Sequence, residues 1–266
     1  MQTISIPQAI LLGIVQGVSE FLPISSDGHL SLVQQWLGLT EDLLVFDVFL
    51  HFFTFLAIIV FFAKDILLLR LNDIKVLVIG TIPAVVVGLL FEDTIEALLH
   101  STLFVSVALI ITGIGNFIAH YAFQRRNQAQ PVGSHESSLP RHVSYSKAFL
   151  IGLLQSVAIL PGISRSGSTV MGAAVLGMSR MNAFRFSFLL GLPAIFGASV
   201  LQAYKVATEG LGTLSMPVLL VGGVTAGLVG FASLGLFSLI VRKGQLQWFG
   251  WYCVTIGIVS LVITQV

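Results

Sequence analysis

Residues 13–28 read GIVQGVSEFLPISSDG, and residues 152–167 read GLLQSVAILPGISRSG. Aligned without a gap, at an offset of 139 residues, the two segments share an early glutamine, an Ile-Ser pair and a final glycine. Each segment interrupts a longer apolar run, at about 4–38 and 147–179, with proline, glycine and serine. Because these residues end helices and form turns, each run predicts two short helices around a polar turn. The gapless match through the turn indicates an internal duplication.

The composition places the chain in a lipid bilayer. Of its 266 residues, 56% are hydrophobic and 9% are charged, and the mean hydropathy is +0.97. A soluble domain carries about 25% charged residues. The net charge of +1 says nothing useful about partners, but the absence of a basic stripe argues against a nucleic-acid partner. Cys253 is the only cysteine, which excludes a disulfide framework and a cysteine-based metal site.

Apart from the two interrupted runs, the chain contains long apolar stretches that each approach the roughly 20 residues needed to span a bilayer. A bilayer leaves the backbone no partner but itself, so these stretches predict helices. We therefore expect an all-α polytopic membrane protein in which residues 1–266 form one membrane domain. It should contain about six spanning helices and two re-entrant helical hairpins, with the spanning helices at about 43–63, 74–91, 98–121, 186–204, 216–241 and 246–264.

The positions of the basic residues predict how the hairpins are oriented. If the first hairpin opens to the outside, eleven of the thirteen lysines and arginines fall on the inside, as the positive-inside rule favours. The first hairpin then enters from outside and the second from inside, so the two halves are inverted-topology repeats. Repeat 1 should cover about 4–121 and repeat 2 about 147–264, joined by a cytoplasmic loop at 122–146. The two turns should meet near a cavity in the membrane interior.

The first turn contains residues suited to activating a nucleophile. Glu20 is costly in a membrane without a partner or a function, and it shares a helical face with Gln16. Ser26 and His29 are three residues apart, a spacing that can bring a hydroxyl within reach of an imidazole. Helix capping by Ser25 or by Ser26 is the structural alternative.

The second turn contains residues suited to binding a phosphate group. Glycines, hydroxyls and Arg165 lead into a helix, where backbone N–H groups and a guanidinium can bind phosphate oxygens. The alternative for Arg165 is a structural ion pair with Glu20, and both interpretations place the two turns in contact. The candidate phosphate-binding residues around Arg165 are Pro161, Gly162, Ser164, Ser166, Gly167 and Thr169.

Two further features have less specific interpretations. Asp47 and His51 are four residues apart near the end of an expected spanning helix, and they either line the cavity mouth or lie at the membrane interface. The glycine-rich run at 222–230 (GGVTAGLVG) is more typical of a close helix-packing face than of a site.

Taken together, these motifs resemble those of the bacitracin-resistance family of undecaprenyl-diphosphate phosphatases. One signature of the family is matched by Gln16 and Glu20 followed by residues 21–29 (FLPISSDGH). A second signature is matched at every fixed position by residues 161–169 (PGISRSGST), and residues 186–190 (FSFLL) match a third segment. The resemblance spans essentially the whole chain.

The resemblance implies an enzyme that hydrolyses undecaprenyl diphosphate to undecaprenyl phosphate and inorganic phosphate. Such an enzyme recycles the lipid carrier for cell-wall synthesis and confers bacitracin resistance. It implies a multi-pass protein of the bacterial cytoplasmic (inner) membrane, and the topology expected from the basic residues opens its active site to the outer face. The expected partners are the polyprenyl diphosphate and the bilayer, and a homodimer is left open.

The resemblance also implies roles for individual residues. Ser26 would be the nucleophile and His29 its acid/base partner, although the histidine is the nucleophile in some accounts of the family. Glu20, with Gln16, would hold a divalent cation, Mg²⁺ or Ca²⁺, or position water. The diphosphate would be bound by Ser25 and by the second turn, namely Pro161, Gly162, Ser164, Arg165, Ser166, Gly167 and Thr169.

Three residues depart from the family pattern. Gln16 removes one carboxylate of a frequent pair, which weakens a metal site. Asp27 stands where a threonine is usual and either repels an anion or supplies the missing metal ligand, and Arg185 stands where an acid is frequent. The alternative function is a transporter or flippase of a polyprenyl phosphate lipid, because inverted repeats with broken helices are also a transporter architecture. An activated Ser26 favours the enzyme.

Overall fold

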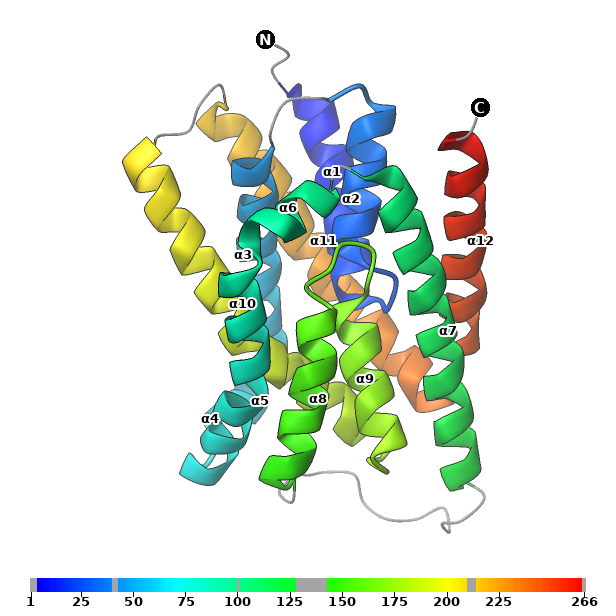
Figure 1. Cartoon of the computed structure of the whole chain (residues 1–266). Coiled ribbons are helices and arrows are strands. Elements are labelled where there is room, and N and C mark those ends of the chain that lie inside the picture. The colour runs from blue at the N-terminus through cyan, green and yellow to red at the C-terminus, as the bar shows by residue number, and fades with distance from the viewer. Residues whose placement is uncertain (1–3, 40–42, 100, 128–142, 210–213, 265–266) are drawn as a thin grey trace.

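The computed structural model describes residues 4–39, 43–99, 101–127, 143–209 and 214–264. These residues form a bundle of helices and contain no strand (Figure 1). The helices are α1 (Ile6–Phe21), α2 (Ser26–Trp36), α3 (Leu44–Phe61), α4 (Ala63–Leu67), α5 (Leu71–Leu90), α6 (Glu92–Leu99), α7 (Thr102–Asn127), α8 (Tyr145–Val157), α9 (Arg165–Val175), α10 (Arg180–Glu209), α11 (Met216–Lys243) and α12 (Gln247–Thr264).

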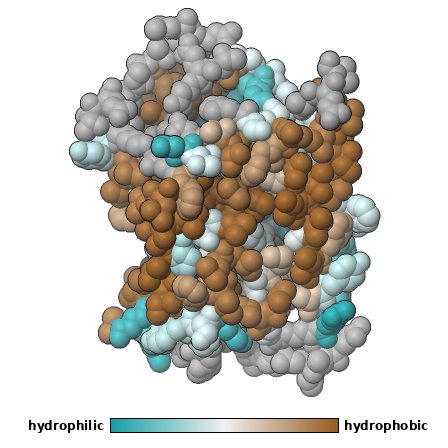
Figure 2. Space-filling model, in the orientation of Figure 1, coloured by the Kyte–Doolittle hydropathy of each residue, from teal (hydrophilic) through white to brown (hydrophobic). Residues whose placement is uncertain are grey.

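The expected membrane character of the bundle is confirmed. By length and composition, α5, α7, α10 and α11 are each able to cross a membrane, and α1, α3 and α12 contain shorter apolar helices. Six of these seven helices lie where the sequence predicted spanning helices. Figure 2 shows hydrophobic residues covering the middle of one face, with hydrophilic residues mainly toward its two ends. The chain is an all-α polytopic membrane protein.

Several helix boundaries differ from the expected ones because buried side chains extend the helices. The predicted loop at 122–146 begins too early, since α7 continues to Asn127 and buries Phe123. Residues 128–142 of that loop lie outside the described residues. In the same way, α10 begins at Arg180 and not at 186, because its first turns bury Met181 and Phe184.

The two re-entrant hairpins are α1–α2 and α8–α9, and they enter the bundle from opposite ends (Figure 1). The offset of 139 residues that aligns the sequences also carries both ends of α2 onto both ends of α9. The caps match as well: Ser25 Oγ accepts a hydrogen bond from Gly28 N at 3.4 Å, and Ser164 Oγ accepts one from Gly167 N at 3.1 Å. The duplication seen in the sequence is therefore repeated in the local structure.

Glycines allow the first helix of each hairpin to pack closely on a spanning helix of the other half of the chain. A Cβ on Gly13 of α1 would lie 2.5 Å from the carbonyl oxygen of Gly222 in α11. A Cβ on Gly152 of α8, at the matching position, would lie 2.9 Å from the carbonyl carbon of Gly80 in α5. The prediction that residues 222–230 form a close packing face is confirmed.

Helix ends that carry basic residues in the sequence, among them the end of α7 and the start of α8, lie at the lower end of the bundle in Figure 1. At this end Lys147 Nζ donates to the carbonyl oxygen of Leu176 at 3.0 Å, which joins the start of α8 to the end of α9. Arg180 Nη1 donates to the carbonyl oxygen of Arg242 at 3.2 Å, which joins the start of α10 to the end of α11. The helix ends that the charge pattern assigned to one side of the membrane therefore lie together.

Candidate active site

The turns of the two hairpins are in direct contact. Ser166 Oγ of the second turn donates to the carbonyl oxygen of Leu22 in the first at 3.2 Å. A Cβ on Gly28 would lie 3.1 Å from the Cα of Gly162, so the two backbones approach closely. This contact was expected from both interpretations of the second turn, and it brings residues about 140 positions apart into one site.

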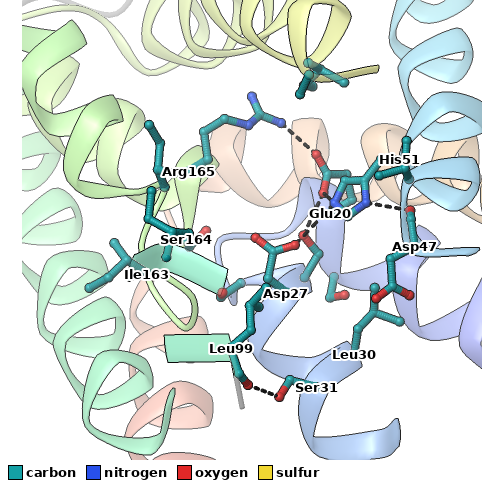
Figure 3. Close-up of a pocket in the computed structure, with 18 of the residues that line it drawn as sticks. Glu20, Asp27, Leu30, Ser31, Asp47, His51, Leu99, Ile163, Ser164 and Arg165 are labelled. Atoms are coloured by element: carbon teal, nitrogen blue, oxygen red, sulfur yellow. Dashed lines mark hydrogen bonds and ion pairs between the residues drawn. The ribbon is translucent and has the colours of Figure 1, made fainter. Parts of the chain in front are cut away.

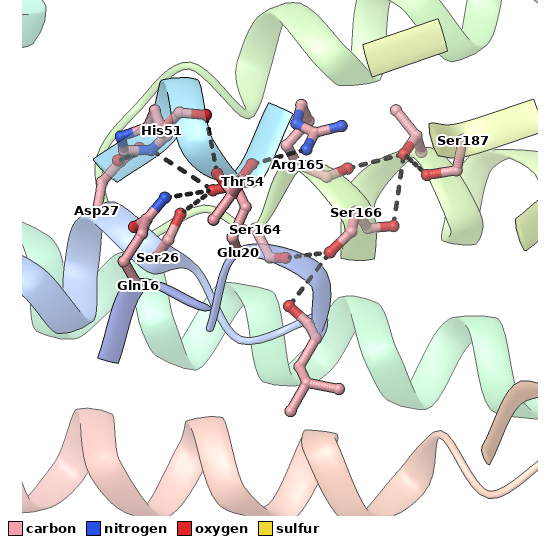
Figure 4. A network of polar contacts seen from close by, with 12 residues as sticks. Gln16, Glu20, Ser26, Asp27, His51, Thr54, Ser164, Arg165, Ser166 and Ser187 are labelled. Atoms are coloured by element: carbon pink, nitrogen blue, oxygen red, sulfur yellow. Dashed lines mark hydrogen bonds and ion pairs between the residues drawn. The ribbon is translucent and has the colours of Figure 1, made fainter. Parts of the chain in front are cut away.

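The Glu20 carboxylate is the centre of this site (Figure 4). The residue is only 7% exposed, and its two oxygens bond to side chains of both hairpins. Arg165 Nη2 donates to Oε1 at 2.9 Å, while Ser26 Oγ donates to Oε2 at 2.6 Å. Gln16 Nε2 donates to Oε2 at 3.3 Å. A buried carboxylate needs such donors, because an unpaired charge in a membrane costs several kcal/mol (roughly 3 or more).

His51 of α3 completes the charged cluster. Its Nε2 lies 3.4 Å from Glu20 Oε2 and 3.3 Å from Asp27 Oδ1. Its Nδ1 lies 2.8 Å from the backbone carbonyl oxygen of Asp47. A carbonyl only accepts, so Nδ1 carries a hydrogen and Nε2 is the nitrogen that faces the carboxylates. The sequence left open whether Asp47 and His51 line a cavity, and the structure places both in the cavity wall.

The expected contact between Ser26 and His29 is not formed. The His29 ring lies with Nδ1 2.8 Å from the carbonyl oxygen of Ser25 and Nε2 2.9 Å from the hydroxyl of Tyr252, on which it also stacks. Ser26 instead turns toward Glu20 on the neighbouring helix. The spacing argument was wrong here because α12, which supplies Tyr252, offers the imidazole a partner that no local pattern reveals.

A cavity of about 610 Å³ opens beside the charged cluster (Figure 3). Its polar end contains Glu20, Ser26, Asp27, His51 and Arg165. The remaining wall is mainly apolar and comes from α1, α2, α3, α6 and α10 and from segments between helices, with Leu30, Ile95, Leu99, Ile163, Ala194 and Ile195 among its residues. Such a cavity suits a ligand that has one charged end and one apolar end.

Arg165 has binding capacity beyond its ion pair. Its Nη2 bonds to Glu20, whereas its Nη1 is buried and has no hydrogen-bond partner among the described residues. A buried donor without a partner is costly, so a ligand oxygen that reached this nitrogen, which packs beside Gly191, would gain a strong hydrogen bond. The ion-pair and the anion-binding interpretations of Arg165 are therefore compatible.

Comparison with known proteins agrees with this geometry. The family model described as "Bacitracin resistance protein BacA" matches residues 9–259. The chain belongs to this family.

Relatives of the BacA-family chain align over nearly its whole length. An undecaprenyl-diphosphatase of Methanosphaera stadtmanae is 36% identical, with 99% of each chain covered. One from Halothermothrix orenii is 35% identical, with 97% of this chain and 98% of the relative covered. Undecaprenyl-diphosphatase 3 of Bacillus anthracis is 34% identical, with 95% and 96% covered. The resemblance drawn from the two turns is confirmed.

The phosphate-binding residues expected in this BacA-family chain divide into two groups. Ser25, Ser164 and Arg165 line the cavity. The others lie behind it: Ser166 Oγ bonds to a backbone carbonyl of the first turn, and Thr169 Oγ1 bonds to the carbonyl oxygen of Arg165 and to Ser187. This second group also includes three buried residues without a polar side chain, Pro161, Gly162 and Gly167.

The predicted divalent cation finds no ready set of ligands. Among the described residues, no three histidine, cysteine or acidic side chains are arranged to hold a metal ion. Of the expected ligands, Glu20 is already bonded to Arg165 and Ser26, and Gln16 directs its amide nitrogen, not its oxygen, at Glu20. Asp27, the third expected ligand, faces His51. No ready set of ligands is therefore formed by these side chains, and a bound Mg²⁺ or Ca²⁺ stays a prediction.

Proposed function

We propose that this chain is an undecaprenyl-diphosphate phosphatase, which releases inorganic phosphate and leaves undecaprenyl phosphate. Membership of the BacA family supports this, and its relatives carry the name undecaprenyl-diphosphatase. The observation that carries the proposal is the 2.6 Å hydrogen bond from Ser26 Oγ to the buried Glu20, next to Arg165 in an apolar-walled cavity. A nucleophile, a base and an anion-binding group are then together beside a cavity whose wall is mainly apolar.

The substrate would bind with its diphosphate at the polar end of the cavity and its isoprenoid chain along the apolar wall. Arg165 Nη1 and the amino end of α9 supply positive potential for the phosphate oxygens. Leu30 and Ile195 are typical of the wall that would contact the chain.

The reaction follows from the contacts of Ser26 and Glu20. As Ser26 Oγ attacks the terminal phosphorus, its proton passes to Glu20 and the anhydride bond to undecaprenyl phosphate breaks. Arg165 stabilises the charge that spreads over the transferred phosphoryl oxygens. Water then attacks the phosphoserine, Glu20 returns the proton to Ser26, and phosphate leaves. No step is assigned to a metal ion, so a dependence on Mg²⁺ or Ca²⁺ stays a prediction.

We place the chain in the bacterial cytoplasmic membrane with its basic end inside, following the positive-inside rule. The cavity is lined by Gln35, Leu39 and Leu43, which lie toward the other end of the bundle, so the site would open to the outer face. This position agrees with recycling of the lipid carrier for cell-wall synthesis and with bacitracin resistance. A homodimer stays a prediction, which light scattering in detergent tests.

The test is phosphate release from undecaprenyl diphosphate by the purified wild type, Ser26→Ala and Arg165→Ala. We expect the wild type to turn over and each variant to lose at least about 100-fold, roughly 2.7 kcal/mol of barrier. Parallel reactions with Mg²⁺, Ca²⁺ or EDTA test the cation. Absence of phosphate release under every condition would overturn the proposal, and lipid movement in vesicles would then test the alternative of a transporter or flippase.

A further inference from the structure

Helix α7 passes both re-entrant turns, and two of its polar side chains bond to their backbones. Asn116 Nδ2 donates to the carbonyl oxygen of Pro23 in the first turn at 2.6 Å. Thr112 Oγ1 donates to the carbonyl oxygen of Gly162 in the second turn at 2.8 Å and accepts from the amide of Ser164 at 3.0 Å. One helix therefore contacts both turns through side-chain hydrogen bonds.

The two side chains lie on one buried face of α7. Residues four apart are neighbours on a helix, and Thr112 and Asn116 are only 6% and 1% exposed. The same face contacts the second turn directly, since a Cβ on Gly162 would lie 2.6 Å from both the Cβ of Ala108 and the carbonyl oxygen of Val105. The second turn is thus seated on α7 without intervening side chains.

These hydrogen bonds satisfy backbone groups that have no helical partner. Residues 22–25 and 158–164 lie between the short helices and are buried or half-buried. An unsatisfied backbone group in a membrane costs several kcal/mol (roughly 2 or more). Because α7 satisfies groups from both turns, it also fixes where each turn lies relative to the other.

The bonded backbone groups adjoin the reacting side chains. The Pro23 carbonyl is three residues before Ser26, and the Ser164 amide is immediately before Arg165. Neither Thr112 nor Asn116 is among the residues that line the cavity. Their effect on the reaction would therefore act through the positions of Ser26 and Arg165.

We propose that Thr112 and Asn116 are positioning residues, which set the register between the turn that carries Ser26 and the turn that carries Arg165. The expected effect on kcat rests on the proposed phosphatase function, whereas the expected effect on the hydrogen bonds of the turns does not. A displacement near 1 Å costs up to about 100-fold in rate when a reaction depends on alignment. Removal of either polar group should therefore lower kcat more than it changes KM.

The first test compares Thr112→Val with Thr81→Val. Thr81 is a matched control because it is also 6% exposed, and its hydroxyl bonds within its own helix to the carbonyl oxygen of Leu77 at 2.8 Å. We expect Thr112→Val to lower kcat about 10- to 100-fold with KM within about twofold, and Thr112→Ser to restore most of the rate. Thr81→Val should stay within about twofold of wild type. Equal kcat values for the two valine variants would overturn the proposal.

The second test measures hydrogen exchange in the peptide 158–166, which contains the Ser164 amide. Thr112→Val removes the acceptor of that amide, so exchange should accelerate there and remain unchanged in Thr81→Val. Unchanged exchange in Thr112→Val would overturn the proposal. This measurement needs no substrate. It therefore tests whether Thr112 holds the second turn even if the wild type releases no phosphate and the proposed function fails.

Asn116→Leu keeps the proposal testable if Thr112→Val fails to fold. Leucine has no donor for the Pro23 carbonyl. The same loss of kcat in a folded Asn116→Leu protein supports the proposal. Wild-type kcat in that protein contradicts it.

Discussion

The Ser26 hydroxyl donates a 2.6 Å hydrogen bond to Glu20 Oε2, and Arg165 Nη2 donates to the other oxygen of the same carboxylate. One buried group therefore contacts both the candidate nucleophile and the candidate phosphate-binding arginine. Glu20 has two consequences for the reaction: it can accept the serine proton, and it holds the guanidinium beside that serine.

Glu20→Gln should abolish most of the activity while leaving the fold intact. The amide keeps the shape of the side chain but accepts a proton poorly and carries no charge for Arg165. We expect kcat to fall at least about 100-fold, roughly 2.7 kcal/mol of barrier, in the phosphate-release assay. Asp93→Asn, which changes an exposed carboxylate, is the control and should retain wild-type kcat. An active Glu20→Gln would exclude Glu20 as the base.

His29 should act through the shape of the first turn and not through proton transfer. Its Nδ1 bonds to the carbonyl oxygen of Ser25, next to Ser26, and its Nε2 bonds to Tyr252. The amide nitrogen of an asparagine is placed much like Nδ1, so His29→Asn preserves the donor, whereas His29→Leu removes it. We expect His29→Asn to retain at least about tenfold more activity than His29→Leu, a difference of about 1.4 kcal/mol. Equal inactivity of the two variants would assign an acid/base role to His29.

Much of this arrangement could be predicted because its signals are local. The repeated Gln, Ile-Ser and Gly pattern predicted both hairpins, and Glu20 and Arg165 were expected together because an unpaired charge in a membrane is costly. The contacts that the sequence did not predict involve helices that lie far apart in the sequence. The orientation of His29 is set by Tyr252, 223 residues away, and no spacing in the sequence connects them. For His51, the sequence offered two interpretations, since its contact with Glu20 requires the packing of α3 against the first hairpin.

The pairing of His51 with Asp27 and Glu20 should control substrate affinity. Without the imidazole, two carboxylates face the site where a diphosphate would bind, and like charges repel it. His51→Leu should raise KM about tenfold or more, about 1.4 kcal/mol. Adding Asp27→Asn removes one of the two charges, so the double variant should recover part of the loss. The KM values of the wild type, His51→Leu, Asp27→Asn and the double variant measure this coupling. Strictly additive effects on KM would show that the two residues act independently.

The close packing of α1 on α11 should make Gly13 intolerant of a side chain. A Cβ there would lie 2.5 Å from the Gly222 carbonyl oxygen and 3.0 Å from the Cβ of Thr225, so Gly13→Ala forces the helices apart. Overpacking of this kind costs about 1–3 kcal/mol. Gly235→Ala is the matched control, because a Cβ at that helical position meets no atom within 4 Å, and alanine favours a helix over glycine. Thermal unfolding in detergent should show a lower Tm for Gly13→Ala and an unchanged or higher Tm for Gly235→Ala. A Tm for Gly13→Ala equal to that of wild type would mean that α1 can move away from α11 at no cost, and that the position of Glu20 at the end of α1 depends on other contacts.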